Sequence, residues 1–156
     1  MRLSLLLLMC LVYISATAQP RVPVAIIIDD LGNSLELGRQ AVALPAQLTY
    51  SVLPQRPYSR EIADHANAVG KEVMLHLPMQ ADGNRRMGPG GLRSTMDRET
   101  FSRQLRASVI NVPHVAGVNN HTGSLLTRQP EAMRWLMEGL RCLGEFYFVD
   151  SRTDVR

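Results

Sequence analysis

The chain has 156 residues, of which 46% are hydrophobic and 20% charged, so it is long enough for one globular domain with a real core. Its formal net charge is only +3, and the basic residues are dispersed along the chain. The three Phe, four Tyr and one Trp form no stripe with basic residues, which argues against a nucleic-acid-binding protein.

The first residues are typical of a secretory signal peptide. Arg2 precedes an apolar run from Leu3 to Ile14, and Ala16-Thr17-Ala18 places small residues at the −3 and −1 positions. The run is shorter than the roughly 20 apolar residues of a membrane span, and a retained anchor is the alternative. We expect cleavage after Ala18, a mature domain over 19–156, a secreted or periplasmic location, and no stable membrane insertion.

Strand and helix signals alternate along the rest of the chain. The expected order is strand 24–28, helix 35–42, strand 48–53, helix 59–69, strand 72–77, a helix beginning at 97 or 100, strand 115–118, a helix from 130 to a stop at 144, and strand 146–149. Continuous apolar runs mark the strands, Asn33 and Glu36 form a capping pair, and Gly70 ends a helix.

This alternation predicts an α/β fold with a parallel sheet and right-handed crossovers. Five strands with no closing helix fit two architectures. One is a (β/α) barrel that is cut short, and the other is a complete small open sheet.

Polar residues stand at the ends of four of these strands. They are Asp29-Asp30, His76, Asn119-Asn120-His121 and Asp150. Because the carboxyl ends of parallel strands open onto one face, these side chains should converge. Carboxylates and imidazoles together can bind a metal ion and move protons. Each of these residues also has a purely structural alternative. The acids and amides would form turns or cap helices, His76 would be a buried histidine with its hydrogen bonds satisfied, and Asp150 would form an ordinary ion pair with Arg152.

The connection from Pro78 to Thr95 is unusually long for a compact domain. It contains the run Gly88-Pro89-Gly90-Gly91 and follows His76 closely. Loops of this length tend to be functional, and this one should overhang the same face.

Four short motifs and this loop occur in a fixed order between about Val24 and Thr153. They are Ile26-Ile27-Ile28-Asp29-Asp30-Leu31-Gly32, Leu75-His76-Leu77-Pro78-Met79, Gly88-Pro89-Gly90-Gly91-Leu92, Gly117-Val118-Asn119-Asn120-His121-Thr122-Gly123-Ser124 and Phe148-Val149-Asp150-Ser151-Arg152-Thr153. In order and spacing they resemble the divergent polysaccharide deacetylase family. The resemblance implies a distorted (β/α) barrel of the polysaccharide deacetylase type. It also implies a metal-dependent hydrolase that removes N-acetyl groups from a polysaccharide or cell-envelope glycan.

The resemblance further implies roles for individual residues. Asp29 would be the general base, and Asp30, His76 and His121 would hold a divalent metal ion, with Zn²⁺ as the default. Supporting or substrate-binding roles would fall to Asn119, Asn120, Asp150 and Arg152. The expected reaction is attack of water on an acetamide carbonyl that the metal polarises, while Asp29 takes the proton.

Two features depart from the family pattern. Gln80 stands four residues after His76, where better-characterised deacetylases have a second histidine, so the second imidazole must come from His121. Members of the divergent family also continue past the segment 150–153, so we expect this domain to be incomplete at its C-terminus.

Two other interpretations stay open. One is a secreted carbohydrate- or envelope-binding protein that keeps the fold but has lost turnover. The other is a structural fragment whose polar strand ends are only caps and turns.

Overall fold

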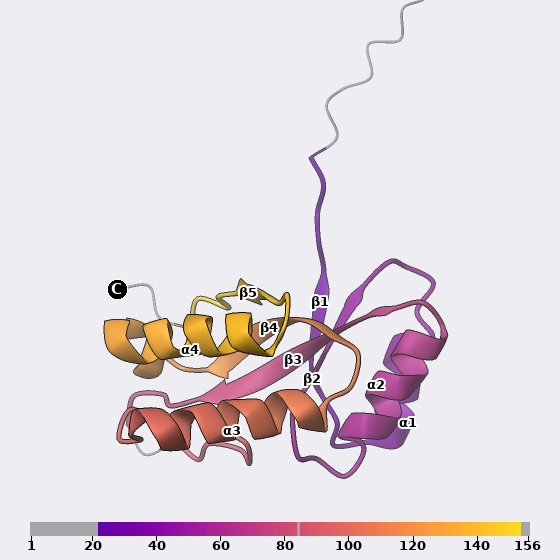
Figure 1. Cartoon of the computed structure of the whole chain (residues 1–156). Coiled ribbons are helices and arrows are strands. Elements are labelled where there is room, and N and C mark those ends of the chain that lie inside the picture. Colours follow the sequence, from indigo (N-terminus) through magenta and orange to yellow (C-terminus); the bar gives the residue numbers. More distant parts are fainter. Residues whose placement is uncertain (1–21, 84, 154–156) are drawn as a thin grey trace, which may run out of the picture.

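The structure is a computed structural model that describes residues 22–83 and 85–153. Within these ranges, five strands alternate with four α-helices (Figure 1). The strands are β1 (Ile27–Leu31), β2 (Thr49–Val52), β3 (Glu72–Met79), β4 (Val115–Thr122) and β5 (Tyr147–Val149). The helices are α1 (Leu35–Val42), α2 (Ser59–Ala68), α3 (Arg98–Asn111) and α4 (Pro130–Leu143), and a short 3₁₀ helix, η1 (Leu126–Arg128), precedes α4. The order of elements is the predicted one.

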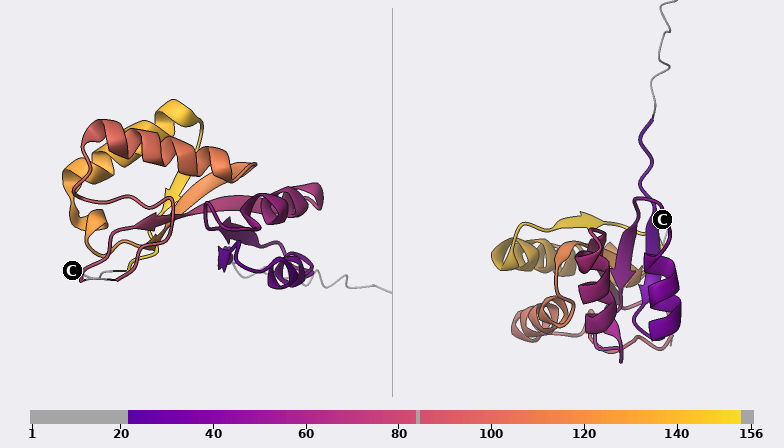
Figure 2. Two further views of the ribbon diagram at one scale, coloured as in Figure 1. Left: turned by 90° about the horizontal axis from the view of Figure 1, so that it is seen from below. Right: turned by 90° about the vertical axis from the view of Figure 1, so that its right-hand side faces the viewer.

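The strands are all parallel, and they lie in the sheet in the order of the chain, β1-β2-β3-β4-β5. Right-handed crossovers between successive neighbours place every helix on the same face of the sheet. Figure 2 shows the helices on this face, and α1 contacts α2 while α3 contacts α4. In (β/α) barrels, neighbouring strands of the sheet follow one another in the order of the chain. In doubly wound sheets, the strand order reverses at one point in the sheet. In the described part of the chain β1 and β5 form open edges, so the sheet is barrel-like in order but does not close.

The hydrophobic core lies between the sheet and the helices. On β3, Val73, Leu75, Leu77 and Met79 all belong to this core. Because successive strand residues point to opposite faces, the intervening His76 lies on the face turned away from the helices.

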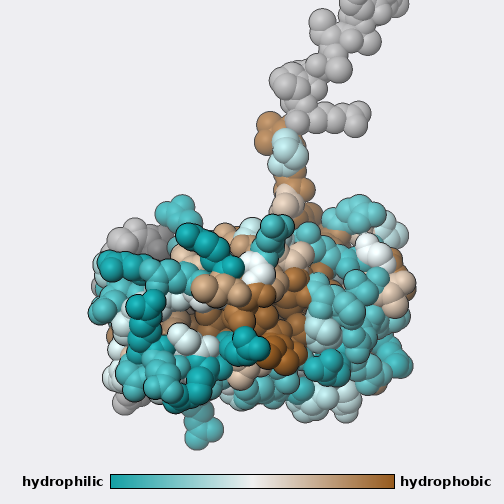
Figure 3. Space-filling model, in the orientation of Figure 1, coloured by the Kyte–Doolittle hydropathy of each residue, from teal (hydrophilic) through white to brown (hydrophobic). Residues whose placement is uncertain are grey.

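The helices are amphipathic in the way that this packing requires. Helix α4 buries Ala132, Leu136 and Leu140, at spacings of four residues, and exposes Glu131 and Arg134. Figure 3 shows the resulting surface, largely hydrophilic with an apolar patch near the middle of the view.

Local boundaries differ from the sequence prediction at several elements, and β3 runs to Met79, two residues beyond its predicted end. Ser34 caps α1 instead of Asn33, because the Ser34 hydroxyl accepts a hydrogen bond from the Leu37 amide. Strand β1 begins at Ile27 and not at Val24, and it includes both aspartates that were expected to follow it. The choice between Asp97 and Thr100 at the start of α3 is settled in favour of Asp97, whose carboxylate accepts from the Thr100 amide at 2.7 Å.

The expected signal peptide over residues 1–18 lies outside the described residues, so cleavage after Ala18 stays a prediction. Among the helices of the described ranges, none combines the length and the apolar character that crossing a membrane requires.

Candidate metal centre

The two aspartates of β1 are brought to one side by an irregularity in the strand. Ile28 pairs with Tyr50 and Leu31 pairs with Val52, so β1 has one residue more than β2 over this stretch. Such a bulge re-aims side chains that strict alternation would send to opposite faces. Asp30 has φ of 64°, a left-handed conformation that Asp tolerates better than most residues. As a result, carboxylate oxygens of both Asp29 and Asp30 approach the ring of His76, at 3.6 and 3.2 Å.

The two histidines come from neighbouring strands. His76 of β3 pairs with Asn119 of β4, and Pro78 pairs with His121 two residues further on. His76, Asn119 and His121 therefore share one face of the sheet. The prediction that residues 119–121 follow the end of their strand was wrong, because β4 continues to Thr122. They reach the site through strand alternation and not through a turn.

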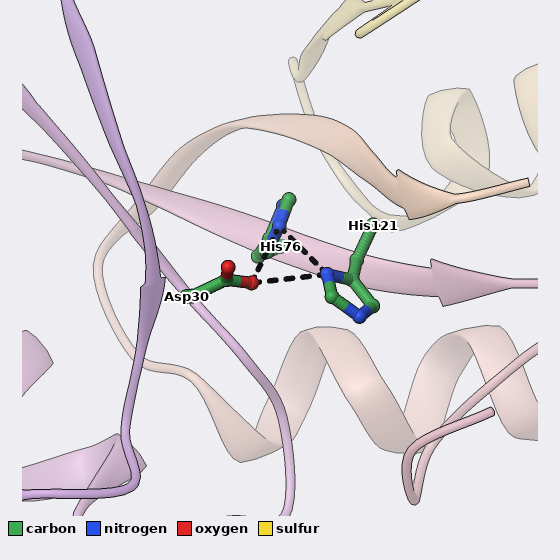
Figure 4. Close-up of side chains that lie close together, drawn as sticks. All are labelled: Asp30, His76 and His121. Carbon is green, nitrogen blue, oxygen red and sulfur yellow. Dashed lines mark hydrogen bonds and ion pairs between the residues drawn. The ribbon is translucent and has the colours of Figure 1, made fainter. Parts of the chain in front are cut away.

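Asp30, His76 and His121 form a compact triangle of potential metal ligands (Figure 4). The distance from Asp30 Oδ1 is 3.2 Å to His76 Nε2 and 3.0 Å to His121 Nδ1. The two ring nitrogens lie 3.1 Å apart. Ligands on a tetrahedral ion with bonds of about 2.0–2.1 Å would be separated by roughly 3.4 Å, so small adjustments would seat an ion.

Asn119 fixes which nitrogen of His76 carries the proton. Its amide nitrogen donates to Asp29 Oδ1 at 2.9 Å, and its amide oxygen accepts from the Ser51 hydroxyl at 2.6 Å. His76 Nδ1 lies 2.8 Å from the same oxygen and must donate to it. In a neutral ring, Nε2 then presents its lone pair to Asp30 and His121.

The surroundings favour this neutral ring. Burial lowers the pKa of His76, and this effect outweighs the hydrogen bond with Asn119 and the nearby carboxylates, which raise it. Neutral imidazole is the form that binds metals. The Nε2 lone pair and the Asp30 carboxylate oxygen, 3.2 Å apart, repel each other, and a cation that binds both removes this repulsion. The donor set therefore fits a divalent ion in both geometry and charge.

The remaining predicted site residues lie outside this triangle. Asn120 is buried; its amide nitrogen donates to the Thr122 carbonyl, and its oxygen accepts from the Ser151 amide. Asp150 is exposed and accepts from the Arg152 backbone amide at 2.9 Å, which is a local turn contact. Because Val149 pairs with Asn119, Asp150 still lies at the same edge of the sheet as the triangle.

Ser51 was not predicted from the sequence, although it completes the buried network around Asn119. It is fully buried in β2, between the apolar residues Tyr50 and Val52. A serine flanked on both sides by large apolar residues of a strand was the signal that could have identified it.

Replacing Asn119 with alanine should reduce the free energy of unfolding by about 1–3 kcal/mol, because the buried Ser51 hydroxyl and His76 Nδ1 would each lose their acceptor. Urea unfolding of the two proteins gives this difference. Asn67→Ala on the exposed side of α2 is the matched control and should leave stability nearly unchanged. Equal effects of the two substitutions would show that the Asn119 network contributes nothing.

Comparisons with known proteins agree with this arrangement. A family model described as divergent polysaccharide deacetylase matches residues 26–156. The uncharacterized protein YibQ of Escherichia coli K12 is 37% identical over 129 residues, which are 83% of this chain and 40% of YibQ. An uncharacterized protein of Haemophilus influenzae is 32% identical over 129 residues, covering 83% of this chain and 46% of the relative. The chain thus spans less than half of the length of these curated relatives.

A solved structure shows the same fold. The crystal structure of uncharacterized protein ATU2773 from Agrobacterium tumefaciens C58 superposes with a TM-score of 0.75, covering 84% of this chain and 54% of that one. Sequence identity is 22%, so this likeness concerns the fold alone.

Proposed function

The chain belongs to the divergent polysaccharide deacetylase family, and from that premise we propose that it is a metal-dependent hydrolase that removes N-acetyl groups from a polysaccharide or cell-envelope glycan. The observation that carries the proposal is the triangle of Asp30, His76 and His121, with the carboxylate of Asp29 beside it. The matched relatives are described only as uncharacterized, so they add no activity of their own.

Asp30, His76 and His121 would hold the ion, and Zn²⁺ is the default for one carboxylate and two imidazoles. When bound, such an ion supplies Lewis-acid polarisation of a carbonyl and lowers the pKa of water. Three protein ligands leave coordination open for other groups, as is usual in catalytic sites.

Asp29 is the proposed general base. Its Oδ1 is fixed by the Asn119 amide at 2.9 Å, and Asp29 is not part of the ligand triangle. Both features support a role in which Asp29 accepts a proton from the water that attacks the acetamide carbonyl. Asn119 acts as a positioning residue, because it holds both the Asp29 carboxylate and the His76 ring.

The location remains part of the proposal. A cleaved signal peptide over residues 1–18 would deliver the domain to the periplasm or the exterior, where envelope glycans are found.

Acetate release tests the proposed function. Purified protein loaded with Zn²⁺ should release acetate from chitotetraose or from peptidoglycan fragments, and a chelator should stop the release until Zn²⁺ is restored. Sugar binding without acetate release would support the non-catalytic carbohydrate-binding interpretation instead. If the protein neither binds sugar nor releases acetate, the proposal is wrong.

A further inference from the structure

Arg56 stands at the carboxyl end of the sheet, in the connection between β2 and α2. A side chain on Gly32, two residues after Asp30, would meet the Arg56 side chain at 3.1 Å. A side chain on Gly88 would meet a terminal guanidinium nitrogen of Arg56 at 2.7 Å and Pro78 at 3.8 Å. Pro78 is the strand partner of His121. Arg56 therefore lies among the segments that surround the candidate metal centre.

The Arg56 side chain is half-buried, and its guanidinium has no acceptor among the described residues. Its Nε is buried and has no hydrogen-bond partner, and among the described residues no hydrogen bond or ion pair engages any other guanidinium nitrogen. A buried donor of a charged group is costly when it is left unpaired, so such a group calls for a partner. No other buried side-chain donor or acceptor in the described ranges is unpaired.

Hydrogen bonds fix the backbone around Arg56, unlike that of an arginine in a flexible surface loop. Gln55 has φ of 54°, an unusual left-handed conformation, and its amide donates to the side chain of Asn111. The Arg56 amide donates to the Ser59 hydroxyl at 2.9 Å, and that hydroxyl donates to the Leu53 carbonyl at 2.6 Å. Strained but well-fixed backbone of this kind is concentrated at ligand sites.

The neighbouring loop adds positive charge and little negative charge. Arg85 and Arg86 are exposed in the connection between β3 and α3, and neither forms an ion pair within the described part of the chain. Asp82 of the same connection is paired with Arg128. The connection that carries Gly88, which lies against the Arg56 guanidinium, therefore presents two arginines that have no acidic partner in the described ranges, and positive charge of this kind suits an anion.

We propose that Arg56 binds an oxyanion of the substrate, so that the glycan acted on at this site is acidic and carries a carboxylate or a phosphate near its N-acetyl group. This inference rests on the proposed deacetylase function and adds the substrate class to it. The planar guanidinium matches the two oxygens of a carboxylate or phosphate and gives a charge-assisted pair. Arg56 is a specificity residue in this scheme and not a catalytic one.

Binding measurements test the proposal without depending on turnover. Titration calorimetry would use Zn²⁺-loaded protein with Asp29→Asn, so that the sugars are not consumed. The probes are neutral chitotetraose, a hyaluronan tetrasaccharide with carboxylates, and N-acetylglucosamine with and without a 6-phosphate. At least one acidic probe should bind about 10-fold or more tightly than its neutral counterpart, and the probe that does so identifies carboxylate or phosphate.

Two substitutions connect this preference to Arg56. Arg56→Gln should remove the preference for the acidic probe and leave binding of the neutral one unchanged. Gly88→Val should act in the same direction, because its side chain would displace the guanidinium while the backbone of residue 88 needs no glycine. Arg134→Gln, an exposed position on α4, is the matched loss of charge and should have no effect.

The outcomes separate the two proposals. Equal binding of acidic and neutral probes, or an equal loss of both in Arg56→Gln, would overturn the role of Arg56 and leave the deacetylase proposal standing. If none of the sugars binds, both proposals fail.

Discussion

Alanine at either His76 or His121 should lower the affinity of the protein for Zn²⁺ by at least about 100-fold. Each imidazole supplies one of only three ligand atoms in the triangle. Removing a residue that only hydrogen-bonds to a metal ligand already lowers metal affinity by about 10–100-fold, so removing a ligand itself should lower it more. Calorimetric titration of metal-free protein with Zn²⁺ measures the change.

The two variants differ in how far they disturb the fold. The His76 side chain is 4% exposed and hydrogen-bonded to Asn119, so His76→Ala also breaks a buried hydrogen bond, whereas the His121 side chain is 30% exposed. His121→Ala is therefore the cleaner variant. His114→Ala is the control, because His114 pairs with Asp64 on the surface and should not affect the metal. Stoichiometric Zn²⁺ binding that persists in His121→Ala would place the ion elsewhere.

Replacing Asp29 with asparagine should slow acetate release by about 10²–10⁴-fold, the usual contribution of a positioned general base, while Zn²⁺ affinity changes little. The asparagine oxygen can still accept from the Asn119 amide, so the network around His76 should survive. Its amide cannot take a proton, and only the proton-transfer step is removed. Steady-state rates with saturating metal, together with the zinc titration, measure both quantities.

Asp64→Asn is the control for Asp29→Asn, because it removes one carboxylate from a surface pair with His114 and touches no site residue. An unchanged rate in Asp29→Asn would mean that another group takes the proton. A loss of Zn²⁺ binding in the same variant would make Asp29 a metal ligand and not a base.

The sequence alone was sufficient for the order of the elements. The apolar runs, the caps and the glycine stops depend on residues close together in the chain, and the five strands and four α-helices of the described ranges follow them. The same local signals placed the carboxylates and imidazoles in the carboxyl-terminal part of their strands, but β1, β3 and β4 continue through these residues instead of ending before them. The family resemblance is likewise carried by short motifs and agrees with the family match over residues 26–156.

Tertiary structure decided which of these side chains meet. Asp29 and Asp30 face one histidine because β1 carries a bulge against β2, and a register shift between two strands cannot be read from one of them. Asn119 connects Ser51, His76 and Asp29, which are 68, 43 and 90 residues away in sequence. The tautomer of His76 follows from that contact, so it too was beyond sequence reasoning.

Arg56 shows most clearly the difference between what the sequence determines and what the tertiary structure determines. In the sequence it is one arginine beside a proline, with no motif around it. Only the folded chain brings Gly32 and Gly88, from two other connections, against its side chain and leaves its buried Nε without an acceptor among the described residues. Periodicity and turn chemistry are local, and they fixed which elements form. Burial and electrostatic partnership depend on contacts between distant segments. Only the folded chain could therefore show the distances within the triangle that the resemblance implied, the amide that supports it, and the arginine that has no acceptor in the described ranges.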